Sequence, residues 1–161
     1  MAAMEMNEKL TLGLGPMDQT HQDFVDAYNA LLGASGQALL DAMDAFIAHS
    51  VEHFDQENLW MEKIGFPGCH KAEHDRVLAV CRDVRKRLER GDTALVRQLI
   101  QEIPVWFGNH VSSMDAALAA YIQSIGFDTE TGEIRNPAAM EGGGCGGAPA
   151  TEEACHTPQP A

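Results

Sequence analysis

Histidine and carboxylate side chains recur along this chain at spacings that suit a metal site. Two pairs, His53 with Glu57 and His70 with His74, are each four residues apart. Four residues correspond to about 400° of rotation in an α-helix, so the members of a pair share one face about one turn apart. Helices of a bundle can present such side chains to a metal in the core. The full candidate set is His21, His53, Glu57, His70, His74, His110 and Asp115.

Burial of these seven side chains in one core requires compensation. A buried polar group without a partner costs about 1–3 kcal/mol, and an ionised carboxylate costs more, whereas a domain is stable by only about 5–15 kcal/mol. Coordination to cations supplies the compensation. Five imidazoles and two carboxylates exceed what one tetrahedral zinc ion uses, and they suit two octahedral ions that share the carboxylates. Iron is the expected metal, although residue types alone leave a di-zinc or mixed centre open.

Two positions need a local explanation. His110 and Asp115 are five residues apart, about 140° round a regular helix. Either the two side chains reach the metals from two sides, or the helix widens locally into a π-bulge, and we favour the widening. His49 lies four residues before His53 and is a rival to His21 as a ligand. His49 lies one helical turn beyond the expected plane of the metal ions. We therefore expect its ring to be exposed or to lie behind the ligands.

The elements that position these side chains are predicted to be helices. Apolar residues recur at the i, i+3, i+4, i+7 spacing of amphipathic helices. Glycine-containing breaks divide the chain into helices over residues 18–33, 37–64, 69–90 and 93–125, with Asp18 as the first N-cap and Gly126 after the last. The short connections predict an all-α fold, an antiparallel up-down-up-down four-helix bundle. Pro104 lies inside the fourth helix and predicts a kink or a break there.

Three regions are expected along the chain. Residues 1–10 are a lead-in and residues 11–127 form the bundle. Residues 128–161 are a flexible, disordered Gly/Pro-rich tail, because the run GGGCGG and the prolines around it show no apolar periodicity.

The charge balance excludes several classes of partner. The 161 residues include 11 Lys and Arg against 24 Asp and Glu, which gives a formal charge of −13. Nucleic acids and anionic membranes need clustered basic residues, so neither is expected as a partner. The longest apolar runs fall far short of the roughly 20 residues that cross a bilayer, and the N-terminus shows no basic stretch followed by an apolar core. We therefore expect a cytoplasmic protein.

Four motifs, one on each predicted helix, resemble those of the hemerythrin family, in particular its single-domain bacterial members. They are Met17-Asp18-Gln19-Thr20-His21, His53-Phe54-Asp55-Gln56-Glu57, His70-Lys71-Ala72-Glu73-His74, and Trp106-Phe107-Gly108-Asn109-His110 followed by Asp115. Each motif alone recurs by chance, but the ordered set is specific. The resemblance covers about residues 11–126.

The resemblance implies a non-haem di-iron centre that binds O2 reversibly. One iron would be held by three histidines and the other by two, the second keeping an open position for O2. The implied assignment is His70, His74 and His110 for the first iron, His21 and His53 for the second, and Glu57 and Asp115 as bridges. The O2 pocket has to be dry and apolar, and its expected lining is Trp106, Phe107 and Phe54.

The chain departs from the family pattern at a few places. Phe107 stands where leucine is usual, which could narrow the pocket, and Asn58 stands where many relatives have a second glutamate. The lead-in lacks the usual tryptophan. Pro104 lies two residues before the Trp106–Phe107 pair and affects the local geometry near the pocket.

The expected function is that of an O2 carrier, store or supplier, not of an enzyme. Two alternatives stay open. One is a di-iron enzyme that acts on peroxide, NO or ferrous iron, although such enzymes of the ferritin-like class use more carboxylates, typically in two Glu-x-x-His motifs. The other is an O2- or redox-sensing interaction module, in which the metal-stabilised bundle or the tail serves a protein partner.

Overall fold

The computed structural model describes residues 1–142, and their regular structure is helical. The elements are α1 (Gly15–Gly33), α2 (Gln37–Ile64), α3 (Cys69–Glu89), α4 (Ala94–His110), the π-helix η1 (Val111–Asp115), α5 (Ala116–Ile125) and the short α6 (Ala138–Gly142). Over these residues the one strand-like pairing is an isolated bridge between Phe127 and Ile134. The predicted all-α class is confirmed.

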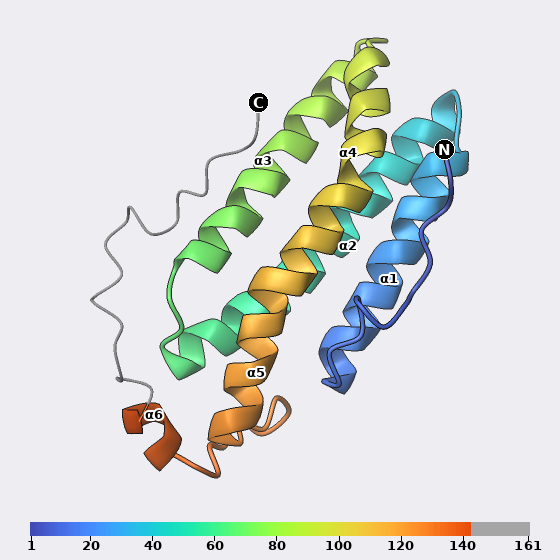
Figure 1. The fold of residues 1–161 in the computed structure, drawn as a ribbon. Coiled ribbons are helices and arrows are strands. Elements are labelled where there is room, and N and C mark those ends of the chain that lie inside the picture. Colours follow the sequence, from blue (N-terminus) through green and yellow to red (C-terminus); the bar gives the residue numbers. More distant parts are fainter. Residues whose placement is uncertain (143–161) are drawn as a thin grey trace, which may run out of the picture.

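Four helical rods lie side by side. Figure 1 shows α1, α2 and α3 beside a long rod made of α4, η1 and α5, with successive rods running in opposite directions. Each of α1, α2 and α3 packs against the next helix along the chain, as short connections require. None of the helices within residues 1–142 has the length and apolar character needed to span a membrane.

The ends of α2 and α5 both depend on a glycine. Gly65 after α2 has φ 65°, and Gly126 after α5 has φ 61°. This left-handed conformation is unfavourable for residues with a Cβ, and glycine commonly ends helices in this way. Gly126 was predicted in this role, which is confirmed. A Cβ at Gly126 would also lie 3.0 Å from the Cβ of Arg135.

The start of α1 differs from the prediction. The helix begins at Gly15, and Asp18 lies inside its first turn, so Asp18 is not the N-cap. Its carboxylate instead accepts hydrogen bonds from the backbone N–H groups of Leu12 and Gly13, at 2.7 and 3.0 Å. Asp18 therefore fixes the incoming chain against the end of the helix.

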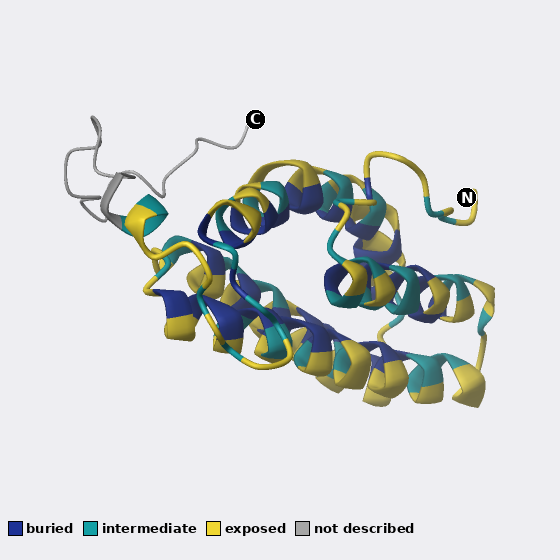
Figure 2. Cartoon of the chain, turned by 90° about the horizontal axis from the view of Figure 1, so that it is seen from below, coloured by how far each residue is buried: buried dark blue, intermediate teal, exposed yellow. Residues whose placement is uncertain are grey.

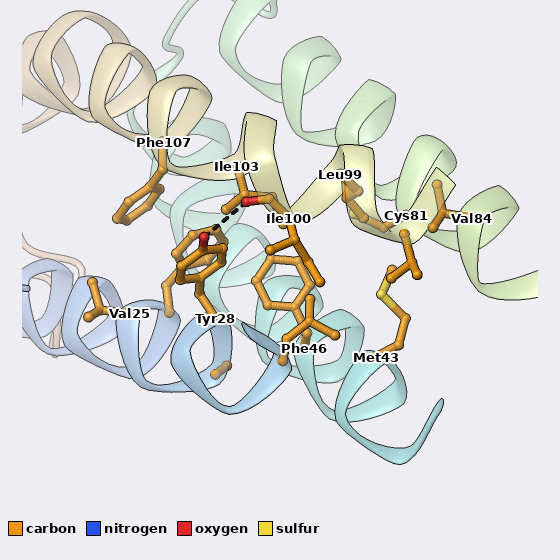
Figure 3. Close-up of a cluster of buried hydrophobic side chains, with 14 of the residues drawn as sticks. Val25, Tyr28, Met43, Phe46, Cys81, Val84, Leu99, Ile100, Ile103 and Phe107 are labelled. Carbon is orange, nitrogen blue, oxygen red and sulfur yellow. Dashed lines mark hydrogen bonds between the residues drawn. The ribbon is translucent and has the colours of Figure 1, made fainter. Parts of the chain in front are cut away.

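Helix α4 continues through Pro104, so the predicted break does not occur there. Proline has no backbone N–H, and the carbonyl of Ile100, four residues earlier, therefore lacks its usual intrahelical donor. The hydroxyl of Tyr28 on α1 donates a hydrogen bond of 2.9 Å to this carbonyl (Figure 3). A side chain from another helix thus satisfies the group that the proline leaves without a partner.

Two apolar clusters flank the predicted metal ligands along the bundle. Figure 2 shows that the buried residues follow the inner side of each helix. The first, which we call the Phe46 cluster, includes Phe24, Tyr28, Met43, Phe46, Leu99, Ile100, Ile103 and Phe107. The second, the Ile122 cluster, includes Met17, Trp60, Ile64, Leu118, Ile122 and Ile125. Along α1, α2 and the last rod, the histidine and carboxylate positions fall between the two clusters.

Residues 1–14 lie against the helices. The side chain of Asn29 on α1 accepts a hydrogen bond from the Met4 N–H at 2.8 Å and donates one to the Met4 carbonyl at 2.9 Å. Leu10 is buried in the Phe46 cluster, and Leu12 packs against it. The N-terminal segment therefore contributes to the core that surrounds the predicted ligands.

Residues 128–142, which the sequence analysis assigned to the tail, fold back onto the end of the bundle. The bridge between Phe127 and Ile134 closes a turn, and α6 follows it. Ile134 and Met140 pack against the Ile122 cluster. The rest of the predicted tail, residues 143–161, lies outside the described residues.

The compensation at Pro104 is testable in a double-mutant cycle. Tyr28→Phe should lower the free energy of unfolding by about 1–2 kcal/mol, because it leaves the buried Ile100 carbonyl without a donor. In a Pro104→Ala background the new backbone N–H can serve that carbonyl, so the same substitution should cost less than half as much. Denaturant melts of the four proteins measure both values. An equal cost in the two backgrounds would contradict the explanation.

Candidate metal centre

Helices α2 and α3 each present two of the predicted ligands on one buried face. On α2, His53 Nε2 lies 3.0 Å from Glu57 Oε1, one turn away. On α3, the rings of His70 and His74 are one turn apart, with centroids separated by 4.5 Å. Their Nε2 atoms lie 3.4 and 3.3 Å from Glu57 Oε2. The predicted four-residue pairs therefore meet at the Glu57 carboxylate.

The π-helix η1 brings His110 and Asp115 to the same centre. Its backbone hydrogen bonds join residues five apart, so residues at this spacing stack on one side of the helix. His110 Nε2 lies 3.0 Å from Asp115 Oδ1, and both side chains are buried. The predicted local widening is confirmed, and it solves the problem that a regular helix would separate these two side chains.

His21 reaches the centre from α1 with a defined tautomer. Its Nδ1 lies 2.8 Å from the carbonyl oxygen of Leu10, and its Nε2 lies 3.0 Å from Asp115 Oδ2. A carbonyl only accepts hydrogen bonds, so Nδ1 carries the hydrogen. In the neutral ring, the lone pair of Nε2 then faces a carboxylate oxygen. That arrangement is repulsive unless a proton or a metal ion lies at Nε2.

The seven side chains form two groups that share their carboxylates. One group contains Glu57, His70, His74, His110 and Asp115, and the other contains His21, His53, Glu57 and Asp115. Within each group, one ligand atom per residue lies within 4.8 Å of all the others, and every member is buried. All seven residues identified from the sequence are thus brought together, as three imidazoles on one side and two on the other.

The donor atoms fit coordination to metal better than hydrogen bonding among themselves. Nε2 of His110 lies 3.2 Å from Nε2 of both His70 and His74. Neighbouring nitrogens of an octahedral ion are about 3.0 Å apart when metal–nitrogen bonds are about 2.1 Å long. Asp115 Oδ1 lies 2.9 Å from His70 Nε2 but has no hydrogen bond of good geometry, and Glu57 Oε2 has none either. Such short distances between poorly aligned donors are expected when a cation belongs between them.

The carboxylates of the centre are held in their ionised form. Burial raises the pKa of Glu57 and Asp115, but the surrounding histidines reverse this effect and bring the pKa of both carboxyls below their ordinary values. On the rings, burial opposes protonation, yet the carboxylates raise the pKa of His70 to about 9 and that of His21 above its usual value. At His74 burial prevails, and the pKa falls. Positive charge beside the carboxylates is therefore the condition under which this core is stable.

Aromatic rings surround the seven side chains, and they include the three predicted pocket residues. Phe54 stacks on the His74 ring with centroids 4.1 Å apart, and Trp106 stacks on His110 at 4.8 Å. Phe107 meets His21 edge-on at 5.5 Å. The lining expected from the sequence therefore lies beside the ligands.

Several residues that hold these side chains were not predicted from the sequence. Phe24 stacks on Phe107 with centroids 4.0 Å apart and meets His53 edge-on, and its position three residues after His21 was a usable signal. The backbone carbonyl of Leu10 orients His21 and leaves no signal in the sequence. Asn58 was noted only as a departure from the family, but its side-chain oxygen accepts a hydrogen bond of 2.9 Å from Nδ1 of the His74 ring.

His49, the rival ligand, is exposed on α2. His21 is fully buried within the centre instead. The expectation that the His49 ring is exposed is confirmed.

Comparison with known proteins defines the class of this protein. The family described as "Hemerythrin HHE cation binding domain" matches residues 13–122. A bacteriohemerythrin of Ralstonia nicotianae is 44% identical over 130 residues, which cover 80% of this chain and 95% of that protein. A bacteriohemerythrin of Methylococcus capsulatus is 31% identical over 108 residues, which cover 63% of this chain and 82% of that protein. The chain belongs to the hemerythrin family, and no solved structure matches it significantly.

Metal content tests the two groups with a matched pair of variants on α2. The purified wild-type protein should hold two metal ions per chain. His53→Ala should lower this content to about one, because only one other imidazole remains in its group. His49→Ala removes an exposed histidine one turn away and should retain both ions. Metal analysis by mass spectrometry measures the content, and equal loss in the two variants would contradict the assignment.

Removal of the metal should also destabilise the fold. A ligand present at a thousand times its dissociation constant stabilises a protein by about 4 kcal/mol, and each 1 kcal/mol shifts the Tm of a domain this size by about 2–4 °C. Extraction with a chelator should therefore lower Tm by roughly 10 °C or more, and re-addition of metal should restore it. A Tm that is the same with and without metal would show that protons on the ring nitrogens are sufficient to balance the buried carboxylates.

Proposed function

We propose that this chain binds O2 reversibly at a pair of iron ions and acts as an O2 carrier, store or supplier. The observation that carries the proposal is the pair of ligand groups sharing Glu57 and Asp115. Two carboxylates common to both groups are suited to bridge two ions, which one ion would not require. Membership of a cation-binding family whose bacterial relatives are bacteriohemerythrins supports iron as the metal and O2 as the ligand.

In this proposal the two ions have different surroundings. The first ion takes three imidazoles and the second takes two, with Glu57 and Asp115 as bridges. The proposed ligands are His70, His74 and His110 for the first ion, and His21 and His53 for the second. With one imidazole fewer, the second ion keeps a position for O2. We propose that residues 11–127 form an antiparallel four-helix bundle and that this bundle is the O2-binding unit.

The chain contributes orientation and exclusion of water. Two ferrous ions bound here would supply the electrons that O2 takes up on binding and returns on release. Leu10 holds the His21 ring through Nδ1, which directs Nε2 at the centre. The ring of Phe107 lies nearly perpendicular to the rings of both His21 and His53, and Phe24 stacks on Phe107. These apolar walls offer water no hydrogen-bond partner, and a dry site slows irreversible oxidation.

The proposal is for a binding protein and not an enzyme. Five imidazoles against two carboxylates give a centre poorer in carboxylate than the di-iron enzymes of the ferritin-like class. A net charge of −13 supports the absence of nucleic-acid and anionic-membrane partners. We keep the cytoplasm, expected from the sequence, as the proposed location.

Spectroscopy of the reduced protein tests this function. Iron-loaded, reduced protein should develop a new visible absorption band in air, lose it when O2 is removed under inert gas, and bind one O2 per two irons. Glu57→Gln should abolish the band because it removes a bridging charge. Glu52→Gln, an exposed position on the same helix, should leave it intact. Catalytic consumption of hydrogen peroxide or NO by the reduced protein, without a reversible O2 band, would favour an enzyme instead.

A further inference from the structure

A groove between α3 and α4 reaches the candidate centre from the surface. It has a volume of about 730 Å³, and its lining includes Arg76 and Val77 from α3 and Trp106 and His110 from α4. Two further grooves of about 440 and 430 Å³ also border α4, but none of the seven proposed ligands lines either of them. Among these three grooves, the first therefore offers the direct approach to the metal ligands.

The indole of Trp106 lines this groove beside His110 and lies between the groove and the aromatic rings around His53. One face of the ring stacks on His110, with centroids 4.8 Å apart and planes inclined by 23°. Trp106 is partly exposed, whereas His110 is buried. Behind the indole lie the rings of Phe24 and Phe54, at 6.4 and 6.2 Å, and both of these rings also contact His53. Displacement of the indole would therefore connect the groove with the apolar space around His53.

A hydrogen bond across the two helices holds the indole in this place. Nε1 of Trp106 donates to Oε1 of Glu73 on α3 at 2.8 Å. The Glu73 carboxylate is itself held by Arg76, whose Nε and Nη2 donate to its two oxygens at 2.8 and 2.7 Å. Hydrogen bonds to charged groups and paired contacts of an arginine with a carboxylate are the stronger kinds. The side chain that stacks on His110 is thus fixed by a residue that is not one of the seven proposed ligands.

We propose that Trp106 is a gate between the α3–α4 groove and the centre, and that Glu73 is the positioning residue that keeps it closed. The inference rests on the proposed O2-binding function and adds the route by which O2 and small solutes reach that site. The lining of the groove mixes polar and apolar residues, and the apolar ones, among them Val77, Leu99 and Ile103, can contact a small apolar molecule such as O2. Opening requires only that the Trp106–Glu73 hydrogen bond breaks and the indole leaves His110.

Rates of access test the gate in the full chain. Glu73→Ala should speed both O2 binding and iron loss to a water-soluble ferrous chelator on the order of tenfold, since a hydrogen bond to a charged group biases an equilibrium by about this factor. Glu73→Gln keeps an oxygen that can accept from the indole and should have a smaller effect. Asp75→Ala is the matched control, because Asp75 is an exposed acid on α3 that forms an ion pair with Lys71. It should behave like wild type.

Fluorescence reports the position of the indole without any O2 chemistry. The chain has two tryptophans, Trp60 and Trp106, so Trp60→Phe leaves Trp106 as the single fluorophore. In the zinc-loaded Trp60→Phe protein, the further substitution Glu73→Ala should increase the quenching of Trp106 fluorescence by acrylamide. Asp75→Ala in the same protein should leave the quenching unchanged. If Trp60→Phe fails to fold, hydrogen exchange of the Trp106 indole N–H, followed by NMR in the chain that keeps both tryptophans, gives the same comparison.

A double-mutant cycle separates a gate from a merely structural role. Trp106→Ala should raise the rate of iron loss by itself, and Glu73→Ala should add nothing in that background, because no indole remains to be held. The gate is overturned if Glu73→Ala matches Asp75→Ala in iron loss and quenching, or if it accelerates iron loss equally with and without Trp106. Failure of the wild-type protein to take up iron would instead overturn the proposed function, while quenching would still test the gate.

Discussion

Two buried carboxylates shared by five imidazoles are the constraint on which this structure depends. Glu57 and Asp115 are fully buried, and no lysine or arginine within residues 1–142 is buried beside them. Their charge has to be balanced at the ring nitrogens, by protons or by metal ions, because an uncompensated buried charge is strongly destabilising. Glu57 comes from α2, Asp115 comes from the last rod, and the imidazole rings come from all four rods. Compensation of the carboxylate charge therefore sets the distances among all four rods.

The last rod departs most from regular helical geometry to meet this constraint. Its π-turn carries poorer hydrogen bonding than an α-helix, and it is retained where His110 and Asp115 must both reach the centre. About two turns earlier, Pro104 removes a backbone donor that Tyr28 replaces. Both irregularities are compensated by contacts that exist only when the rods are assembled. The geometry of this rod is therefore determined more by its contacts with the other rods than by its own sequence.

The predictable part of the fold and site is the part governed by local periodicity. His53 with Glu57 and His70 with His74 could be recognised because helix rotation alone puts them on one face. The spacing of His110 and Asp115 also carried information, since it conflicted with a regular helix. The contribution of Leu10 could not be inferred, because any residue supplies a backbone carbonyl and only the path of the chain brings this one to His21. The role of Asp18 was misassigned for a related reason. An N-cap carboxylate accepts hydrogen bonds from N–H groups of the first helical turn, whereas Asp18 accepts them from N–H groups that precede the helix.

The two sides of the centre also differ in how the aromatic rings cover them. On the side with three imidazoles, Phe54 lies flat on His74 with planes only 5° apart, and no room remains between stacked rings at 4.1 Å. On the side with two imidazoles, the rings of Phe107 and Phe24 lie nearly perpendicular to the imidazoles, at centroid separations of 5.5 to 6.4 Å, and Phe54 is tilted by 49° to His53 at 5.2 Å. Perpendicular rings at these separations are in ordinary aromatic contact, so the two sides differ in the orientation of the rings that cover them. The count of imidazoles and the packing of the rings are independent features, and both distinguish the side of His21 and His53, to which the proposed function assigns the position for O2.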